Sequence, residues 1–334
     1  MRLLKLVPDN TNIDFMKWRN LALAISMLLV IGSIALVAVR GLNLGVDFIG
    51  GQSIRVAFNE EPPLDQLRDQ IGALGQGEAT IQESRGAALP GATARPEVII
   101  RMPLPEGDEA AAARVATQVR GVINANYPGA TVLAVESVSG KVSDELFRSG
   151  ALALALAMLG VAVYIWFRFE WQFGAGAILT LIHDVILILG FFSLTQLEFN
   201  LNIVAALLAI VGYSLNDTVV IYDRIRENLR KYRKMEVTPL INLSLNETLS
   251  RTIVTSLSIL LALFALLLIG PDVVFGLVAG IFVGTLIGTY SSIYISAPVL
   301  VWLKVSGDSF LPNKGIVGGA ERVAPRRTED GAQV

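Results

Sequence analysis

The chain has 334 residues, of which 53% are hydrophobic and 17% are charged, and its formal net charge is -2. Soluble domains carry about 25% charged residues, so this composition excludes an ordinary soluble enzyme, a disordered chain and a nucleic-acid binder that acts through bulk positive charge. The absence of Cys and the single His exclude disulfides, thiolate chemistry and a multi-histidine metal cluster. An integral membrane protein remains, provided that the apolar residues form long runs.

Long apolar runs are present, and each predicts a helix that crosses a membrane, which takes about 20 mostly apolar residues. The six predicted spans are Asn20–Val39, Gly150–Phe167, Gly174–Ser193, Asn202–Tyr222, Thr252–Ile269 and Val273–Leu303. We interpret the first as an uncleaved anchor rather than a signal peptide, because its apolar stretch is too long and no small-residue cleavage site precedes Arg40.

Positive charge in the loops predicts the orientation, because Lys and Arg gather on the cytoplasmic side. They precede the first span and follow the fourth and the last: Arg2, Lys5, Lys17, Arg19, Arg224, Arg226, Arg230, Lys231, Arg233, Lys234, Lys304, Lys314, Arg322, Arg326 and Arg327. We therefore expect residues 1–19 and 304–334 in the cytoplasm and residues 41–149 on the periplasmic side. Asp223 and the three Arg residues just after it are interpreted as solvated charge that sets this topology.

Residues 41–149 predict a small exported domain. They carry 9 Lys or Arg and 14 Asp or Glu, a net charge of -5, against +3 for the rest of the chain. Alternating and helical spacings predict the order strand, helix, strand, strand, helix, strand, which is the ferredoxin-like pattern. The expected elements are Gln52–Phe58, Pro63–Leu74, Ala79–Glu83, Val98–Met102, Glu106–Tyr127 and Ala130–Val138, with a loop over Ser84–Pro96. The domain has no catalytic constellation, so a protein-binding platform is the functional alternative to a purely structural role.

Asp217 is an acidic residue inside the fourth span, where a charge costs about 2.5–3.5 kcal/mol on insertion scales. On a helix it shares a face with Tyr213 and Ser214, and Asn216 lies beside them. Such a face must point into protein or water. It predicts either a polar knot between helices or a proton or ion relay.

Arg251 stands at the cytoplasmic start of the fifth span, with Thr255 and Ser258 continuing its face. The fourth and fifth spans are antiparallel neighbours whose polar stripes lie near the same cytoplasmic end, so their geometry allows a pair between Asp217 and Arg251. The alternative is that Arg251 extends to the interface. His183 and Asp184 in the third span are either packing groups or support for the same relay.

The last span carries Gly276, Gly280, Gly284 and Gly288 at every fourth position. Small residues at this spacing form a flat ridge on which another helix can pack closely. The ridge fits either ordinary packing in the bundle or a sliding or docking interface.

Several motifs, in order along the chain, resemble the SecF family of bacterial protein-export membrane proteins, a relative of the RND transporters. They are Gly45-Val46-Asp47-Phe48-Ile49-Gly50-Gly51, Ser214-Leu215-Asn216-Asp217-Thr218-Val219-Val220, Tyr222-Asp223-Arg224-Ile225-Arg226-Glu227-Asn228, Asn246-Glu247-Thr248-Leu249-Ser250-Arg251-Thr252-Ile253 and Gly288-Thr289-Tyr290-Ser291-Ser292. The resemblance covers residues 16–303.

The resemblance implies a multi-pass protein of the bacterial inner membrane: six helices in an RND-like half, with a periplasmic α+β ferredoxin-like domain after the first. It implies pairing with SecD, association with the SecYEG translocon and YajC, and action on a translocating unfolded preprotein, driven by the proton motive force. Asp217 and Arg251 would form the proton relay, and the motif with Gly45, Asp47, Phe48, Gly50 and Gly51 would be the hinge of the exported domain.

Protons would be the coupling ion, with no cofactor, metal or nucleic acid, and membrane lipid would surround the spans. The alternatives are a structural scaffold for SecD and the translocon, and an RND-type small-molecule transporter subunit. A transporter would need a second six-helix unit, and an enzyme is not expected.

Overall fold

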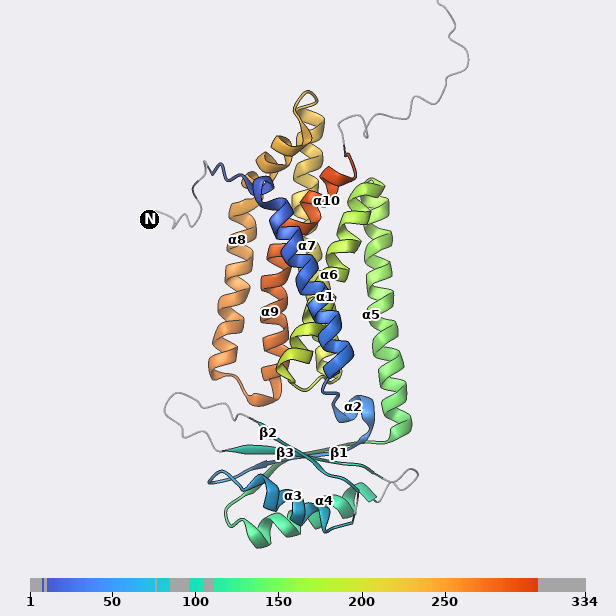
Figure 1. Cartoon of the computed structure of the whole chain (residues 1–334), viewed down its shortest axis with the longest axis vertical. Helices are drawn as coiled ribbons and strands as arrows, with labels where there is room; N and C mark the ends of the chain where they lie inside the picture. Colours follow the sequence, from blue (N-terminus) through green and yellow to red (C-terminus); the bar gives the residue numbers. More distant parts are fainter. Residues whose placement is uncertain (1–7, 9–10, 76, 85–95, 105–110, 306–334) are drawn as a thin grey trace, which may run out of the picture.

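The computed structural model describes residues 8, 11–75, 77–84, 96–104 and 111–305 of the chain. Within them, six helices are long and apolar enough to cross a membrane, and a small α+β domain lies at one end of their bundle (Figure 1). This confirms the predicted fold class. The predicted Ser84–Pro96 loop, residues 106–110 of the second predicted domain helix and most of both terminal segments lie outside the described residues.

The bundle contains every predicted span as a helix. Its elements are η1 (Phe15–Trp18), α1 (Arg19–Arg40), α5 (Gly140–Arg168), α6 (Trp171–Thr195), α7 (Leu201–Lys231), α8 (Val237–Ile269), η2 (Asp272–Val274), α9 (Phe275–Ser291), η3 (Ser292–Ser296) and α10 (Ala297–Trp302). η3 is a π-helical turn, so the last predicted span is one helix with a local change of winding.

Three helices run well past the predicted spans, because apolarity marks only the part of a helix that meets lipid. α5 begins ten residues early, at Gly140, where the Ser139 hydroxyl accepts a hydrogen bond from the Val142 N–H. α7 ends nine residues late and α8 begins fifteen residues early, and together they form a hairpin beyond the bundle (Figure 1). The hairpin has its own apolar contacts, since Leu240 and Ile241 are fully buried.

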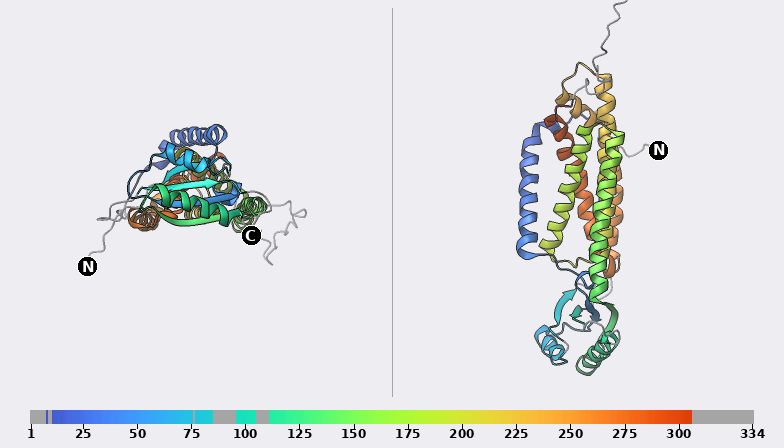
Figure 2. Two further views of the ribbon diagram at one scale, coloured as in Figure 1. Left: turned by 90° about the horizontal axis from the view of Figure 1, so that it is seen from below. Right: turned by 90° about the vertical axis from the view of Figure 1, so that its right-hand side faces the viewer.

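α6, α7 and α9 form the centre of the bundle. In the most apolar 18 residues of each of these spans, about half are buried (50%, 44% and 44%), against 17%, 11% and 11% for the spans of α1, α5 and α8. α1 packs on α6 at one side of the bundle, and α5 stands at the opposite side (Figure 2). Polar side chains on the inward faces of α6, α7 and α9 therefore meet protein rather than lipid.

The α+β domain, here called the sheet domain, has the predicted ferredoxin-like order. Its elements are β1 (Gly51–Ala57), α3 (Leu64–Gly72), β2 (Thr80–Ser84), β3 (Glu97–Met102), α4 (Ala111–Asn126) and β4 (Thr131–Val138). The strand order is β2-β3-β1-β4, with each pair antiparallel. α3 and α4 cover the sheet face away from the bundle (Figure 1), and residues such as Ile54, Leu67 and Val119 are fully buried between the layers.

Candidate site in the membrane bundle

Asp217 lies on the inward face of α7 with 2% of its surface exposed. Its Oδ2 atom is buried and has no hydrogen-bond partner among the described residues. Ser214, one turn earlier on the same face, is fully buried. An unpartnered carboxylate oxygen inside a helix bundle is costly, so this residue requires a reason other than packing.

Asp184 on α6 is the best-bonded acid in the bundle. Its Oδ2 accepts hydrogen bonds from the hydroxyls of Ser214 on α7 (2.5 Å) and Ser291 on α9 (2.9 Å). Its Oδ1 lies 2.9 Å from Nδ1 of His183. Asp184 therefore joins the three central helices, whereas the sequence placed it only in a supporting role.

A second polar chain links α7 to α8 and α9. The Tyr213 hydroxyl donates to Ser256 Oγ at 2.7 Å, and Ser256 Oγ lies 2.8 Å from Thr289 Oγ1. After Arg251, the buried polar residues of α8 are Thr252 and Ser256.

Three residues of the expected polar group stand elsewhere. Asn216 is exposed, because it lies about 100° around the helix from Asp217. Thr255 and Ser258 donate to carbonyls of their own helix, those of Arg251 and Val254, and Ser258 is exposed. The face that continues from Arg251 therefore turns away from the polar chain.

Arg251 is exposed on α8 and is the charged side chain whose field acts on Asp217. Among the described residues, the two make no ion pair. The pairing of Asp217 with Arg251 therefore stays a prediction.

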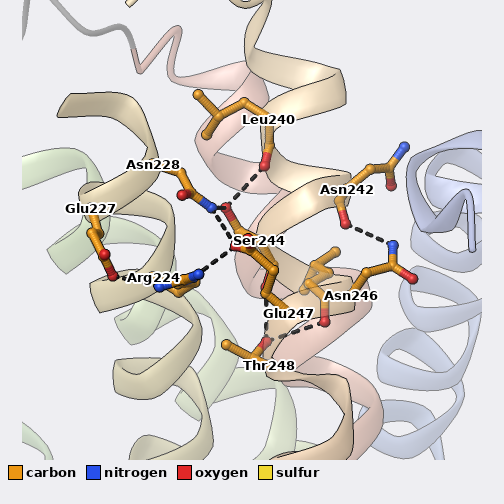
Figure 3. Close-up of polar contacts among 10 residues, drawn as sticks. Arg224, Glu227, Asn228, Leu240, Asn242, Ser244, Asn246, Glu247 and Thr248 are labelled. Carbon is orange, nitrogen blue, oxygen red and sulfur yellow. Dashed lines mark hydrogen bonds and ion pairs between the residues drawn. The ribbon is translucent and has the colours of Figure 1, made fainter. Parts of the chain in front are cut away.

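Beyond Asp217 and Arg251, polar residues join α7 to α8 in the hairpin (Figure 3). Glu247 Oε2 accepts from Arg224 Nε and from Asn228 Nδ2, each at 2.7 Å. Asn228 Nδ2 also donates to Ser244 Oγ at 3.0 Å. We call Arg224, Asn228, Ser244 and Glu247 the hairpin clasp.

The clasp adds partners to a segment that the sequence indicated only as solvated topological charge. Arg224 is bound across the hairpin, Asp223 pairs with Arg168 at 3.0 Å, and Arg226 pairs with Glu170 at 3.4 Å. The positive charges alone did not indicate these partners. The available signal was the set of polar residues in the motifs Tyr222–Asn228 and Asn246–Ile253.

The other side of α8 holds the segment before α1. Asn246 donates to the Ile13 carbonyl at 2.9 Å and accepts from the Ile13 N–H at 2.8 Å. Asn242, one turn earlier, accepts from the Met16 N–H and donates to Asp14. This end of α8 is therefore fixed on two sides.

The glycine ridge of α9 packs mainly against α7. A Cβ atom on Gly276 would contact Ile203, and one on Gly288 would contact Ser214. A Cβ on Gly280 would meet Phe192 and Ala206, and one on Gly284 would lie 2.5 Å from Ile210 Cδ1. The ridge is thus a close helix–helix contact inside the bundle.

The expected hinge motif is the linker between α1 and the sheet, and it contains the one-turn helix α2 (Val46–Ile49). Gly50 and Gly51 have φ of 70° and 105°, which only Gly adopts without strain, and they turn the chain into β1. Phe48 packs between Phe147 and Phe199.

The linker is bonded to the loop between α6 and α7. Asp47 Oδ2 accepts from the Leu201 N–H at the start of α7 (2.9 Å), and the Gly45 N–H donates to the Phe199 carbonyl (2.9 Å). On the sheet, the 8%-exposed Arg101 pairs with Glu198 at 2.9 Å and donates to Asn43 at 2.8 Å. The joint is therefore a bonded contact, here called the junction.

The bundle, its buried acids and the sheet domain define a multi-pass helical membrane protein in which polar groups cross the core. Residues 118–306 match the family of the protein export membrane protein SecD/SecF, C-terminal, and residues 35–61 match the SecD/SecF GG motif. The protein translocase subunit SecF of Rickettsia conorii (strain ATCC VR-613 / Malish 7) is 41% identical over 298 residues, which cover 89% of this chain and 94% of the relative. The subunit of Rickettsia bellii (strain OSU 85-389) is 40% identical over 302 residues, covering 89% and 95%.

The crystal structure of SecDF, a translocon-associated membrane protein from Thermus thermophilus, matches with a TM-score of 0.79 and 34% identity. The match covers 89% of this chain but 39% of the SecDF chain. SecDF in a super-membrane-facing form matches with a TM-score of 0.65 and 35% identity, covering 91% and 40%. The chain belongs to the SecD/SecF family, as a SecF-type subunit of the protein translocase, a transport component.

Proposed function

We propose that this subunit works with SecD to drive the late stages of preprotein translocation with the proton motive force. The observation that carries the proposal is Asp217, a buried carboxyl with an unpartnered oxygen, which lies within the field of Arg251. A group in this state can exist either protonated and neutral or ionised beside a cation.

The relay follows from the two environments open to Asp217. When Arg251 is displaced, burial favours the neutral acid, and Asp217 takes up a proton. When Arg251 approaches, the ion pair favours the carboxylate, and the proton is released. Movement of α8 relative to α7 would thus alternate uptake and release, and Asp184 would hold the neighbouring helices in register through Ser214.

The proposed setting is the bacterial inner membrane, with the sheet domain in the periplasm and both termini in the cytoplasm. The Lys and Arg residues of the hairpin, at the bundle end opposite the sheet domain, support this orientation. The lipid-facing α1, α5 and α8 leave apolar surface for membrane lipid and for SecD. The SecYEG translocon, YajC and the unfolded preprotein are proposed as the further partners.

We predict that Asp217→Asn leaves assembly with SecD intact and abolishes the export that depends on the proton gradient. The amide has the size of the acid but cannot exchange a proton. The measurement is translocation of a preprotein into inverted membrane vesicles, with and without a gradient, with Ser258→Ala as the control. Normal gradient-dependent export by the Asn variant would contradict the relay.

A scaffold for SecD and the translocon is the second candidate, and the lack of a direct Asp217–Arg251 contact favours it. Proton flux through the assembled complex separates the two functions. The relay requires a flux that Asp217→Asn removes, whereas a scaffold shows no flux in either form.

A further inference from the structure

We infer that Glu247 is a positioning residue: through the hairpin clasp it sets the separation of α7 and α8 beside Asp217 and Arg251. The inference rests on the proposed function for its purpose, but its geometry can be tested without it.

The clasp and the proposed relay lie along the same seam between the two helices. On α7, Arg224 and Asn228 follow Asp217 by seven and eleven residues, spacings that return to one helical face within about 20°. On α8, Glu247 precedes Arg251 by four residues, about 6 Å along the axis. The clasp is therefore the polar contact between α7 and α8 on the hairpin side of the relay, and the Tyr213–Ser256 hydrogen bond lies on its other side.

Glu247 is the central group of the clasp. One oxygen, Oε2, accepts from both Arg224 and Asn228, so a single carboxylate holds two turns of α7. Asn228 and Ser244 are buried (1% and 0% exposed). Without Glu247, the buried Asn228 amide would lose an acceptor and Arg224 would lose its partner across the hairpin.

A matched control exists on the same arginine. Glu227 Oε2 also accepts from Arg224 at 2.7 Å, but from α7 itself, and its side chain is 62% exposed. Replacing Glu227 removes the same charge from Arg224 without touching the contact between helices. A comparison of the two glutamates separates positioning from local charge.

The test measures the distance between α7 and α8 directly. The natural chain has no Cys, so Asn216→Cys and Val254→Cys, both exposed, allow two spin labels to be placed in the SecD-bound complex. In Glu247→Gln, pulsed electron–electron double resonance should show a broader distance distribution. The ratio of the native separation to wider separations should fall about tenfold, the effect of removing the charge from a charge-assisted hydrogen bond. Glu227→Gln should match the unsubstituted protein.

Gradient-dependent export is the second measurement. We expect it to fall in Glu247→Gln and to be retained in Glu227→Gln. An unchanged distance distribution in Glu247→Gln would overturn the inference, whether or not export falls.

If Glu247→Gln fails to assemble, Arg224→Lys replaces it, because this variant keeps the charge and loses the Nε donor. It is expected to broaden the same distance distribution, and an unaltered distribution would again overturn the inference. The distance measurement tests the role of Glu247 even if Asp217→Asn leaves export unchanged and the proposed relay fails.

Discussion

Asp184 and Asp217 are both buried acids of the central helices, but their surroundings differ. Asp184 is surrounded by two serine hydroxyls and a histidine nitrogen, whereas Asp217 has an oxygen with no partner. A satisfied buried acid stabilises the contacts it joins, while an unsatisfied one destabilises its site. The first therefore suits structure and the second suits proton exchange.

Asp184→Asn should lower the stability of the purified protein by about 1–3 kcal/mol, because the amide offers one acceptor oxygen where the carboxylate offers two to Ser214, Ser291 and His183. Asp217→Asn should leave stability unchanged or raise it, because it removes an unpartnered charge. Thermal unfolding in detergent measures both, with Ser258→Ala as the neutral control. Equal losses in the two Asn variants would contradict the division of roles.

The sequence was sufficient to place Asp217, Ser214 and Tyr213 on one polar face of the fourth span. Charge is scarce in the spans, and helical periodicity shows which residues of one helix share a face. It could not identify the partners. Whether Ser256 or Ser258 of α8 meets Tyr213 depends on how the neighbouring helix is rotated, which tertiary packing decides. The same limit hid the contact between Asp184 and Ser214.

The glycine ridge of α9 brings the α9 and α7 backbones together, and its four-residue period follows the ridge of a helix surface. Its existence was predictable from the spacing, but its partner was not, because any helix with a suitable groove would fit. The hairpin was not predictable either, since polar helix ends give no hydropathy signal and depend on contacts such as those of Leu240.

Gly284→Ala should destabilise the bundle by about 1–3 kcal/mol, because the added methyl would lie 2.5–2.9 Å from three carbons of the buried Ile210. Gly212→Ala is the matched control: it has open space around the added Cβ, so it should be neutral or slightly stabilising. Thermal unfolding of the two variants checks this contrast. Equal unfolding temperatures would mean that α7 and α9 separate easily.

The junction ties the sheet domain to the bundle through side chains that are distant in sequence. The order of the sheet domain was predictable from alternation and spacing, and the family resemblance implied a hinge at the joint. The hydrogen bond of Asp47 and the ion pair of Arg101 show a bonded contact at that place. Pairings of this kind connect residues 97 and more positions apart along the chain, and no local pattern reveals them.

Arg101→Met should loosen the junction, because it leaves the Glu198 carboxylate without its cation. Hydrogen–deuterium exchange should then be faster at the amides of Gly45 and Phe199, which are bonded across the joint. Arg68→Met is the control, since Arg68 is half exposed and pairs with Asp65 of its own helix. Unchanged exchange in Arg101→Met would show that the glycine linker alone sets the joint.

α7 is one continuous helix of 31 residues, about 46 Å long. Its first N–H is bonded to Asp47 beside the sheet domain, and its last turns carry the hairpin clasp. In mechanical terms, α7 is a stiff rod with a bonded contact at each end. A tension applied to the sheet domain would reach the start of α7 through the Asp47–Leu201 hydrogen bond. The helix would transmit the displacement past Asp217 to the hairpin. Under the proposed function, the force of export and the protonation of Asp217 would then act on the same helix.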